Sequence, residues 1–193
     1  MGTHHGNIYF FREFLKHPTE VAAALPSSRA LVSELLKDFP LKDSKTVVEF
    51  GGGNGVITRQ LLSKVSKSTI CLVVEPNHAF SQMLAAEGAQ VNVIEDYAQN
   101  VGEDILKKYG LVDFIVAGLP YSLMPRETVN SIIAGAHKIL RENGELRIFF
   151  YAHSLLFPKI QGMVFLLRNR FKISEFSVNW KNFPPMAVCR CVK

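Results

Sequence analysis

A β-branched apolar run leads directly into a cluster of glycines, "VVEFGGGNG" at 47–55, and a helical pattern follows. Such a turn between a strand and a helix lets the backbone approach a ligand closely, as in open parallel α/β sheets. The dinucleotide pattern G-x-G-x-x-G fails in both frames, because Val56 or Thr58 stands where its third glycine belongs. The Lys-Ser/Thr pair of a phosphate-binding P-loop is also missing. We therefore expect a different ligand.

Strand and helix patterns alternate along the rest of the chain. Near-continuous apolar strands between helices indicate a parallel sheet that is covered on both faces. The last two strands have no helix between them and add an antiparallel edge, so the predicted fold is a Rossmann-like, seven-stranded α/β sheet. The expected strands are 46–50, 69–76, 90–95, 112–120, 144–152, 171–180 and 185–193, and the expected helices between them are 54–65, 78–88, 98–110, 125–143 and 158–170.

Helical patterns also precede the sheet, at 7–17, 18–25 and 26–39, the last of them ended by Pro40. The length of 193 residues suits one domain. We expect a single domain over 1–193, with a helical cap over 1–40 and an α/β core over 45–193. The chain has no apolar run of spanning length and no secretory signal, so a cytoplasmic protein is expected. Its three cysteines indicate neither a disulfide framework nor a metal site.

One acidic residue precedes the glycines and gives the pattern E-x-G-x-G-x-G, formed by Glu49, Gly51, Gly53 and Gly55. This pattern resembles the cofactor loop of class I S-adenosylmethionine-dependent methyltransferases. The resemblance implies that S-adenosylmethionine is the cofactor and that its methionine part lies against the glycine backbone. It also implies that Glu49 helps to hold the ammonium group of the cofactor.

Two further acids follow the next strands, where the carboxyl ends of a parallel sheet meet. Glu75 ends the second strand about 20 residues beyond the loop, and the resemblance implies that it accepts both ribose hydroxyls. It likewise implies that Asp96 binds the adenine amino group, although a helix cap remains an alternative for this residue. Ser28 and Gly118 complete the expected cofactor-binding set, since the Ser28 hydroxyl could contact the methionine carboxylate.

The acceptor site is expected after the fourth strand, at "AGLPYSLMP". This loop resembles the N/D-P-P-Y/F loop of amino-group methyltransferases and the N-L-P-Y of rRNA adenine dimethylases. In those enzymes the Asn side chain and a backbone carbonyl accept hydrogen bonds from the target amine, and the Tyr stacks on the base. Gly118 replaces the Asn, which weakens the nucleobase interpretation, while the Leu119 and Pro120 carbonyls and the Tyr121 ring remain.

The sequence also resembles a second family, the bacterial soluble phospholipid N-methyltransferases, over nearly the whole length of the chain. The resemblance implies phosphatidylethanolamine or a related amino-lipid as substrate. Aromatic faces hold a methylated ammonium well, so Tyr121, Tyr151 and Tyr9 are candidates for a cage. His153 could accept the amine proton or bind the lipid phosphate. The four similar segments are "FFREFLKHPTEVAAALPSSRAL", "VVEFGGGNGVITRQLL", "VAGLPYSLMP" and "RNRFKISEFSVNWKNFPPMAVCR".

The opening helix and the charge distribution bear on the partners. Residues 7–17 combine a dense aromatic face with basic neighbours, which suits a helix lying on an anionic membrane, although a lid over the cofactor cleft remains open. Residues 141–193 carry nine Lys/Arg and three Asp/Glu, so their net charge is +6. This basic third indicates a membrane surface, a nucleic acid or merely a solvated face.

The sequence therefore predicts a peripheral, S-adenosylmethionine-dependent N-methyltransferase that acts on the amino head group of a phospholipid. The alternative is an rRNA or tRNA adenine N6-methyltransferase, for which RNA would be the partner. A third possibility is a noncatalytic protein that keeps the fold for binding cofactor or membrane. The number of methyl groups transferred and the oligomeric state stay open.

Overall fold

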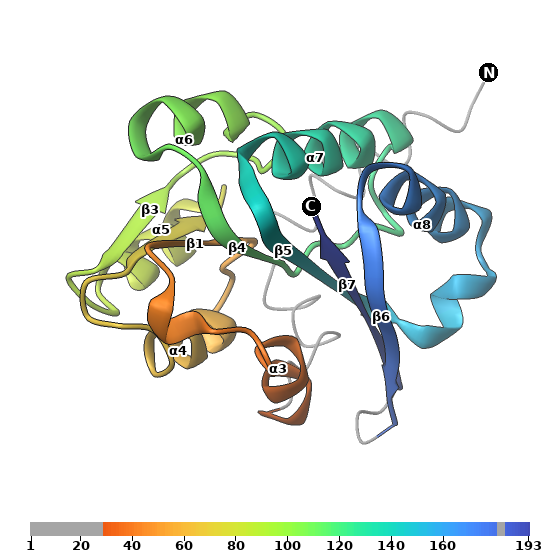
Figure 1. Ribbon diagram of the computed structural model, residues 1–193, viewed down its shortest axis with the longest axis horizontal. Coiled ribbons are helices and arrows are strands. Elements are labelled where there is room, and N and C mark those ends of the chain that lie inside the picture. Colours follow the sequence, from red (N-terminus) through yellow and green to blue (C-terminus); the bar gives the residue numbers. More distant parts are fainter. Residues whose placement is uncertain (1–28, 181–183) are drawn as a thin grey trace.

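The computed structural model describes residues 29–180 and 184–193, and the observed architecture is a seven-stranded mixed sheet (Figure 1). The strand order is β3-β2-β1-β4-β5-β7-β6. Strands β1 to β5 are parallel, whereas β7 pairs antiparallel with both β5 and β6. The predicted fold class is confirmed. The strands are β1 (Thr46–Phe50), β2 (Ile70–Val74), β3 (Val91–Ile94), β4 (Val112–Ala117), β5 (Leu140–Tyr151), β6 (Lys172–Asn179) and β7 (Met186–Val192).

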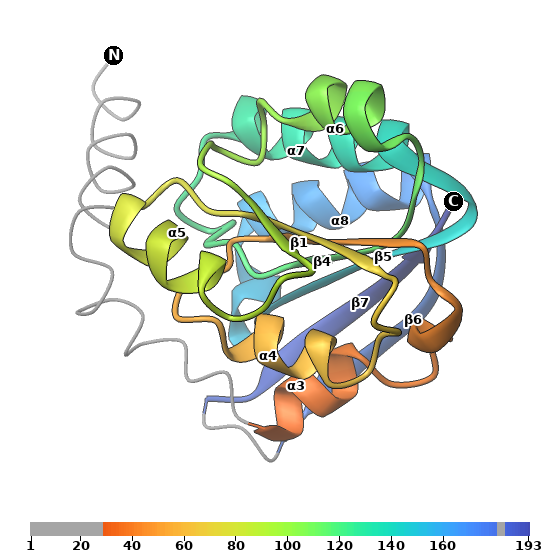
Figure 2. The ribbon, with the colours of Figure 1, turned by 90° about the vertical axis from the view of Figure 1, so that its left-hand side faces the viewer.

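Helices cover both faces of the sheet, as the apolar strands require. Helices α6, α7 and α8 lie on one face, and α3, α4 and α5 lie on the other (Figure 2). The helical elements are α3 (Arg29–Leu35), η1 (Leu41–Asp43), α4 (Val56–Leu62), α5 (His78–Ala85), α6 (Gly102–Tyr109), α7 (Arg126–Ile139), η2 (Ala152–Leu156) and α8 (Pro158–Arg170).

Strand β1 shows how the two faces are built. Val48 and Phe50 belong to the core beneath α6 and α7, whereas Val47 packs into the core on the α3 and α4 side. Side chains alternate between the faces of a strand, so Glu49 shares the α4 side with Val47. An acidic side chain is therefore placed inside an apolar layer.

Helices α3, α4, α5 and α7 each end three or four residues earlier than predicted, and the cause can be seen for α7 and α3. Helix α7 was expected to continue to residue 143, but it ends at Ile139, since Leu140 already pairs with Val112 in the sheet. Helix α3 ends at Leu35 and not at the residue before Pro40. Asp38 has a positive φ of 57°, which does not continue an α-helix.

A buried arginine holds the end of α3 against the sheet. The side chain of Arg147 on β5 is fully buried, and its Nη1 donates to the Leu35 carbonyl at 2.7 Å and also to the Lys37 carbonyl. Its Nε and Nη2 donate to Glu145 Oε2 at 2.9 and 2.7 Å. The guanidinium also lies 5.2 Å from the centroid of the Phe114 ring. Arg147 thus satisfies carbonyls that the end of a helix leaves unpaired.

The predicted helices at 7–17 and 18–25, together with Tyr9 and Ser28, lie outside the described residues. Within 29–180 and 184–193, no helix has the length and apolar character needed to cross a membrane.

Candidate functional site

The glycine loop joins β1 to α4 at the carboxyl edge of the sheet. Gly51, Gly53 and Gly55 have φ values of 85°, 49° and 77°, a region that favours glycine. The loop is tied to the neighbouring strand, because the Gly51 amide donates to the Val74 carbonyl at 2.9 Å. A Cβ on Gly53 would meet no heavy atom within 4 Å, so the backbone there has open space for a ligand.

Gly52 has a different function from its neighbours. A Cβ at this position would lie 2.4 Å from Val73 Cγ1 and 2.7 Å from Leu84 Cδ1. Because Gly52 has no side chain, the loop can pack directly on Val73 of β2 and Leu84 of α5. The sequence alone does not show which of the four glycines is needed for packing and which for close approach of a ligand.

Glu49 is almost completely enclosed, with 1% of its surface exposed. Its Oε2 accepts a hydrogen bond from the Thr58 hydroxyl at 2.6 Å, and Oε1 has no hydrogen-bond partner among the described residues. Burial raises the pKa of Glu49 to about 8, with a further contribution from the nearby Glu75, while Thr58 and Arg59 act in the opposite direction. An unpaired buried oxygen is costly, so this site favours a hydrogen-bond donor or a cation beside Oε1.

Glu75 lies just beyond β2 and faces the same loop. Its Oε2 accepts from the Gly53 amide and its Oε1 from the Asn77 amide, both at 2.9 Å. Burial raises the pKa of Glu75 in spite of these two hydrogen bonds. Asn77 in turn caps α5 by accepting from the Phe80 amide. The carboxylate is thus fixed at the sheet edge and retains lone pairs for a ligand.

Asp96 stands after β3, as predicted. Its Oδ1 accepts from the Tyr97 amide at 2.6 Å and from the Asn100 side chain at 2.7 Å. These local contacts hold the turn before α6 and do not cap that helix, whose N-cap is Val101 without a side-chain cap hydrogen bond. No contact joins Asp96 to Glu49 or Glu75 among the interactions of the described residues.

The loop after β4 lies against the glycine loop. The Gly118 amide donates to the Phe50 carbonyl at 3.0 Å, and a Cβ on Gly51 would lie 2.9 Å from Leu119 Cδ2. A Cβ on Gly118 would come within 3.0 Å of the Phe149 ring. A side chain at position 118 would therefore need the Phe149 ring on β5 to shift. Gly118 and Pro120 are both half-buried.

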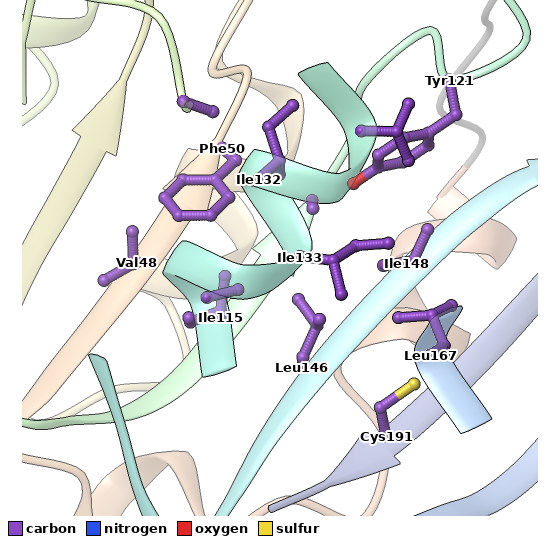
Figure 3. Close-up of a cluster of buried hydrophobic side chains, with 14 of the residues drawn as sticks. Val48, Phe50, Ile115, Tyr121, Ile132, Ile133, Leu146, Ile148, Leu167 and Cys191 are labelled. Carbon is purple, nitrogen blue, oxygen red and sulfur yellow. The ribbon is translucent and has the colours of Figure 1, made fainter. Parts of the chain in front are cut away.

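The prediction that the Tyr121 ring faces the reacting centre is wrong for this conformation. Tyr121 is 3% exposed and belongs to the hydrophobic core with Ile132, Ile133 and Ile148 (Figure 3). Its hydroxyl has no hydrogen-bond partner among the described residues, and burial raises its pKa well above the usual range. The sequence predicts a substrate contact for this aromatic side chain, but its ring packs in the apolar core under α7.

Other aromatic groups do gather at this edge. The Tyr151 and His153 rings are stacked, with centroids 5.4 Å apart and an interplanar angle of 21°. Phe157 meets His153 edge-on at 6.2 Å. Burial raises the pKa of Tyr151. Two candidate site residues, Tyr151 and His153, thus lie side by side, and Phe157 joins them without having been a candidate.

Thr58 is the main site residue that the sequence did not reveal. It stands nine residues after Glu49, and only the packing of α4 on the sheet brings its hydroxyl to the carboxylate. Within the described ranges, no group of three or more His, Cys, Asp or Glu side chains could hold a metal ion.

Solved methyltransferases share this fold. The N-methyltransferase NodS of Bradyrhizobium japonicum WM9 matches with a TM-score of 0.67 and 15% identity, covering 87% of this chain and 97% of that one. The 1,6-didemethyltoxoflavin-N1-methyltransferase of Burkholderia thailandensis, solved with S-adenosylhomocysteine, gives a TM-score of 0.73 at 15% identity, with 100% and 91% covered. These likenesses define the fold as that of the class I methyltransferases.

The family is shown by sequence as well. The model of the methyltransferase small domain matches residues 26–179, and the chain belongs to that family. It is thus a methyltransferase of the class that uses S-adenosylmethionine. A curated relative, the ornithine lipid N-methyltransferase of Singulisphaera acidiphila (strain ATCC BAA-1392 / DSM 18658 / VKM B-2454 / MOB10), is 29% identical over 195 residues, which cover 95% of each chain.

Proposed function

We propose that this protein transfers a methyl group from S-adenosylmethionine to the amino head group of a membrane lipid, phosphatidylethanolamine or a related amino-lipid, at the membrane surface. The observation that carries the proposal is the similarity to an ornithine lipid N-methyltransferase over 95% of both chains. An ornithine lipid and phosphatidylethanolamine both present a primary amine on a lipid, so the same chemistry serves either.

The residues present fit the cofactor. The enclosed Oε1 of Glu49 has no partner among the described residues and would accept from the ammonium group. The open backbone at Gly53 would adjoin the methionine part, and Glu75 would accept the ribose hydroxyls. Asp96 and Ser28 are proposed for the adenine amino group and the methionine carboxylate. When bound, the cofactor supplies an electrophilic methyl group.

The acceptor amine is proposed to lie at the loop that starts with Gly118. The Leu119 and Pro120 carbonyls would accept hydrogen bonds from the amine and direct its lone pair, so the chain contributes mainly by positioning. His153 would accept the proton that the amine loses. With Tyr121 in the core, the Tyr151 ring beside His153 would hold the methylated cation, where a contact with an aromatic face is worth roughly 0.5 to 2 kcal/mol.

The packing of Gly118 argues against the nucleobase alternative. The adenine dimethylases use an Asn side chain at this place, whereas Gly118 has no side-chain acceptor, and a side chain there would press against the Phe149 ring. A base amine would therefore find only backbone acceptors.

A parallel transfer assay tests the proposal. Purified protein and methyl-labelled S-adenosylmethionine are offered phosphatidylethanolamine in mixed micelles, an ornithine lipid in the same micelles, or unmodified RNA. We expect label in one or both lipid fractions. Label in RNA alone would overturn the lipid assignment and support the adenine methyltransferase. Bound cofactor without label in any fraction would exclude all three acceptors.

A further inference from the structure

Three large apolar side chains are exposed in η2, in α8 and at the residue that joins them. Leu156 is 79% exposed, Phe157 50% and Phe165 62%. Leucine and phenylalanine are normally buried, and clustered exposure of such groups marks an interaction surface. We call Leu156, Phe157 and Phe165, with Arg168, the outer face of α8.

Helical spacing separates this face from the core. Phe157, Gln161, Phe165 and Arg168 recur at intervals of three or four residues and so line one side of the helix. Ile160, Met163 and Leu167 are buried on the other side, as expected for core packing. Helix α8 is thus anchored by its inner face, and its outer apolar face has no partner within the described part of the molecule.

A shallow groove of about 320 Å³ runs along this face. Leu155, Val164 and Phe165 supply apolar walls, and Gln161 and Arg168 supply the polar part of the lining. The Gln161 side chain donates to the Leu155 carbonyl at 3.1 Å, which ties η2 to α8. The groove therefore combines apolar side chains with a cation at its border.

The stretch of chain that carries the outer face has charged side chains of one sign. The sequence from Leu146 to Ser174 contains no Asp or Glu, whereas it contains Lys159, Arg168 and two further cations in the exposed part of α8 and the start of β6. Arg168 is exposed and forms no ion pair among the described residues. An apolar face with unpaired cations beside it is complementary to the interface of an anionic bilayer.

This face adjoins the acceptor side of the site. Element η2 begins directly after Tyr151, and Phe157 contacts His153. The Lys159 ammonium donates to the Ser122 carbonyl at 3.2 Å, just beyond Tyr121 in the acceptor loop. A surface bound to the outer face would therefore lie next to the residues proposed to receive the amine.

We propose that the outer face of α8 docks on an anionic lipid bilayer, with Leu156, Phe157 and Phe165 entering the acyl region and Arg168 pairing with lipid phosphate. This docking surface rests on the proposed function, because it delivers the enzyme to a lipid substrate. All of its residues lie in the described part of the chain.

Tryptophan fluorescence reports docking at this helix directly. The chain has a single tryptophan, Trp180, so Trp180→Phe provides a silent background for Phe165→Trp. Leu111→Trp is the matched control. Leu111 is 53% exposed and directly precedes β4, so it lies at the amino ends of the parallel strands, whereas the glycine loop lies at their carboxyl ends. The probe is a phosphatidylglycerol vesicle that contains brominated phosphatidylcholine. We expect quenching and a blue shift at position 165 and neither at position 111.

A partition measurement adds the energetic test. Phe157→Ser and Phe165→Ser should each weaken sedimentation with these vesicles by roughly tenfold, as expected for losing a buried phenyl group. Arg168→Gln should weaken it and reduce its salt dependence, whereas Lys67→Gln, an exposed cation after α4, should change neither.

Three results would overturn the docking surface. They are vesicle binding without quenching at position 165, equal quenching at positions 165 and 111, and absence of vesicle binding. Methyl transfer to a micellar amino-lipid is measured on the same preparations. Transfer without quenching would refute the docking surface alone, and quenching without transfer to any lipid would refute the proposed function alone.

Discussion

Glu49→Gln tests whether the carboxyl next to the glycine loop is neutral in the cofactor-free protein. Its pKa rises from 4.5 to about 8 because it is buried beside Glu75. A carboxyl whose pKa is raised by folding stabilises the folded state fully below the unfolded value, and this contribution is lost as the pH rises through the folded value. At about 1.4 kcal/mol per unit, the loss between pH 4.5 and 8 is on the order of 5 kcal/mol.

The assay is urea unfolding of the cofactor-free protein at pH 5, 6, 7 and 8. The free energy of unfolding of the wild type should fall relative to that of Glu49→Gln by about 1.4 kcal/mol per pH unit, since Gln cannot ionise. Glu127→Gln, which removes an exposed carboxyl from the first turn of α7, should retain the wild-type slope. S-adenosylhomocysteine should reduce the slope in the wild type, because its ammonium favours the charged carboxylate. Parallel pH profiles for wild type and Glu49→Gln would refute the reasoning.

Three other substitutions separate packing from ligand binding. Gly52→Ala should destabilise the fold by about 1 to 3 kcal/mol in urea unfolding, because the added methyl group overpacks against Val73. The control Gly162→Ala, in open space on α8, should be neutral or stabilising. Equal effects of the two substitutions would contradict the packing role of Gly52. Arg147→Ala should cost roughly 3 to 5 kcal/mol, because it leaves buried polar groups unpaired, and a loss below about 1 kcal/mol by thermal or urea unfolding would contradict this. Glu75→Ala should weaken S-adenosylhomocysteine binding in calorimetry by at least tenfold and leave vesicle sedimentation unchanged; loss of both would mean that the two functions share this residue.

The sheet and its order along the chain could be predicted because the signals are local. The apolar run "TVVEF" and the glycines after it predict β1 at the residues where it occurs. The hairpin of β6 and β7 follows from two strands without a helix between them. Element ends were harder, because tertiary contacts decide them. Pairing of Leu140 with Val112 ends α7 early, although the helical pattern continues beyond it.

The site was predictable where it depends on backbone and only partly where it depends on packing. The positive φ values of Gly51, Gly53 and Gly55 follow from their spacing after the strand. The orientation of Tyr121 does not follow from the sequence, because its ring could turn either to the cleft or to the apolar core under α7. The contact of Thr58 with Glu49 also could not be predicted from the sequence, because it depends on how α4 packs on the sheet.

The most direct test of lipid methylation is tandem mass spectrometry of amino-lipids that have been incubated with the protein and S-adenosylmethionine carrying a deuterated methyl group. We predict that phosphatidylethanolamine, an ornithine lipid or both acquire the deuterated methyl on the head-group nitrogen, and that Glu75→Ala abolishes the product. An unlabelled lipid fraction, with cofactor binding intact, would contradict the assignment of an amino-lipid as the substrate.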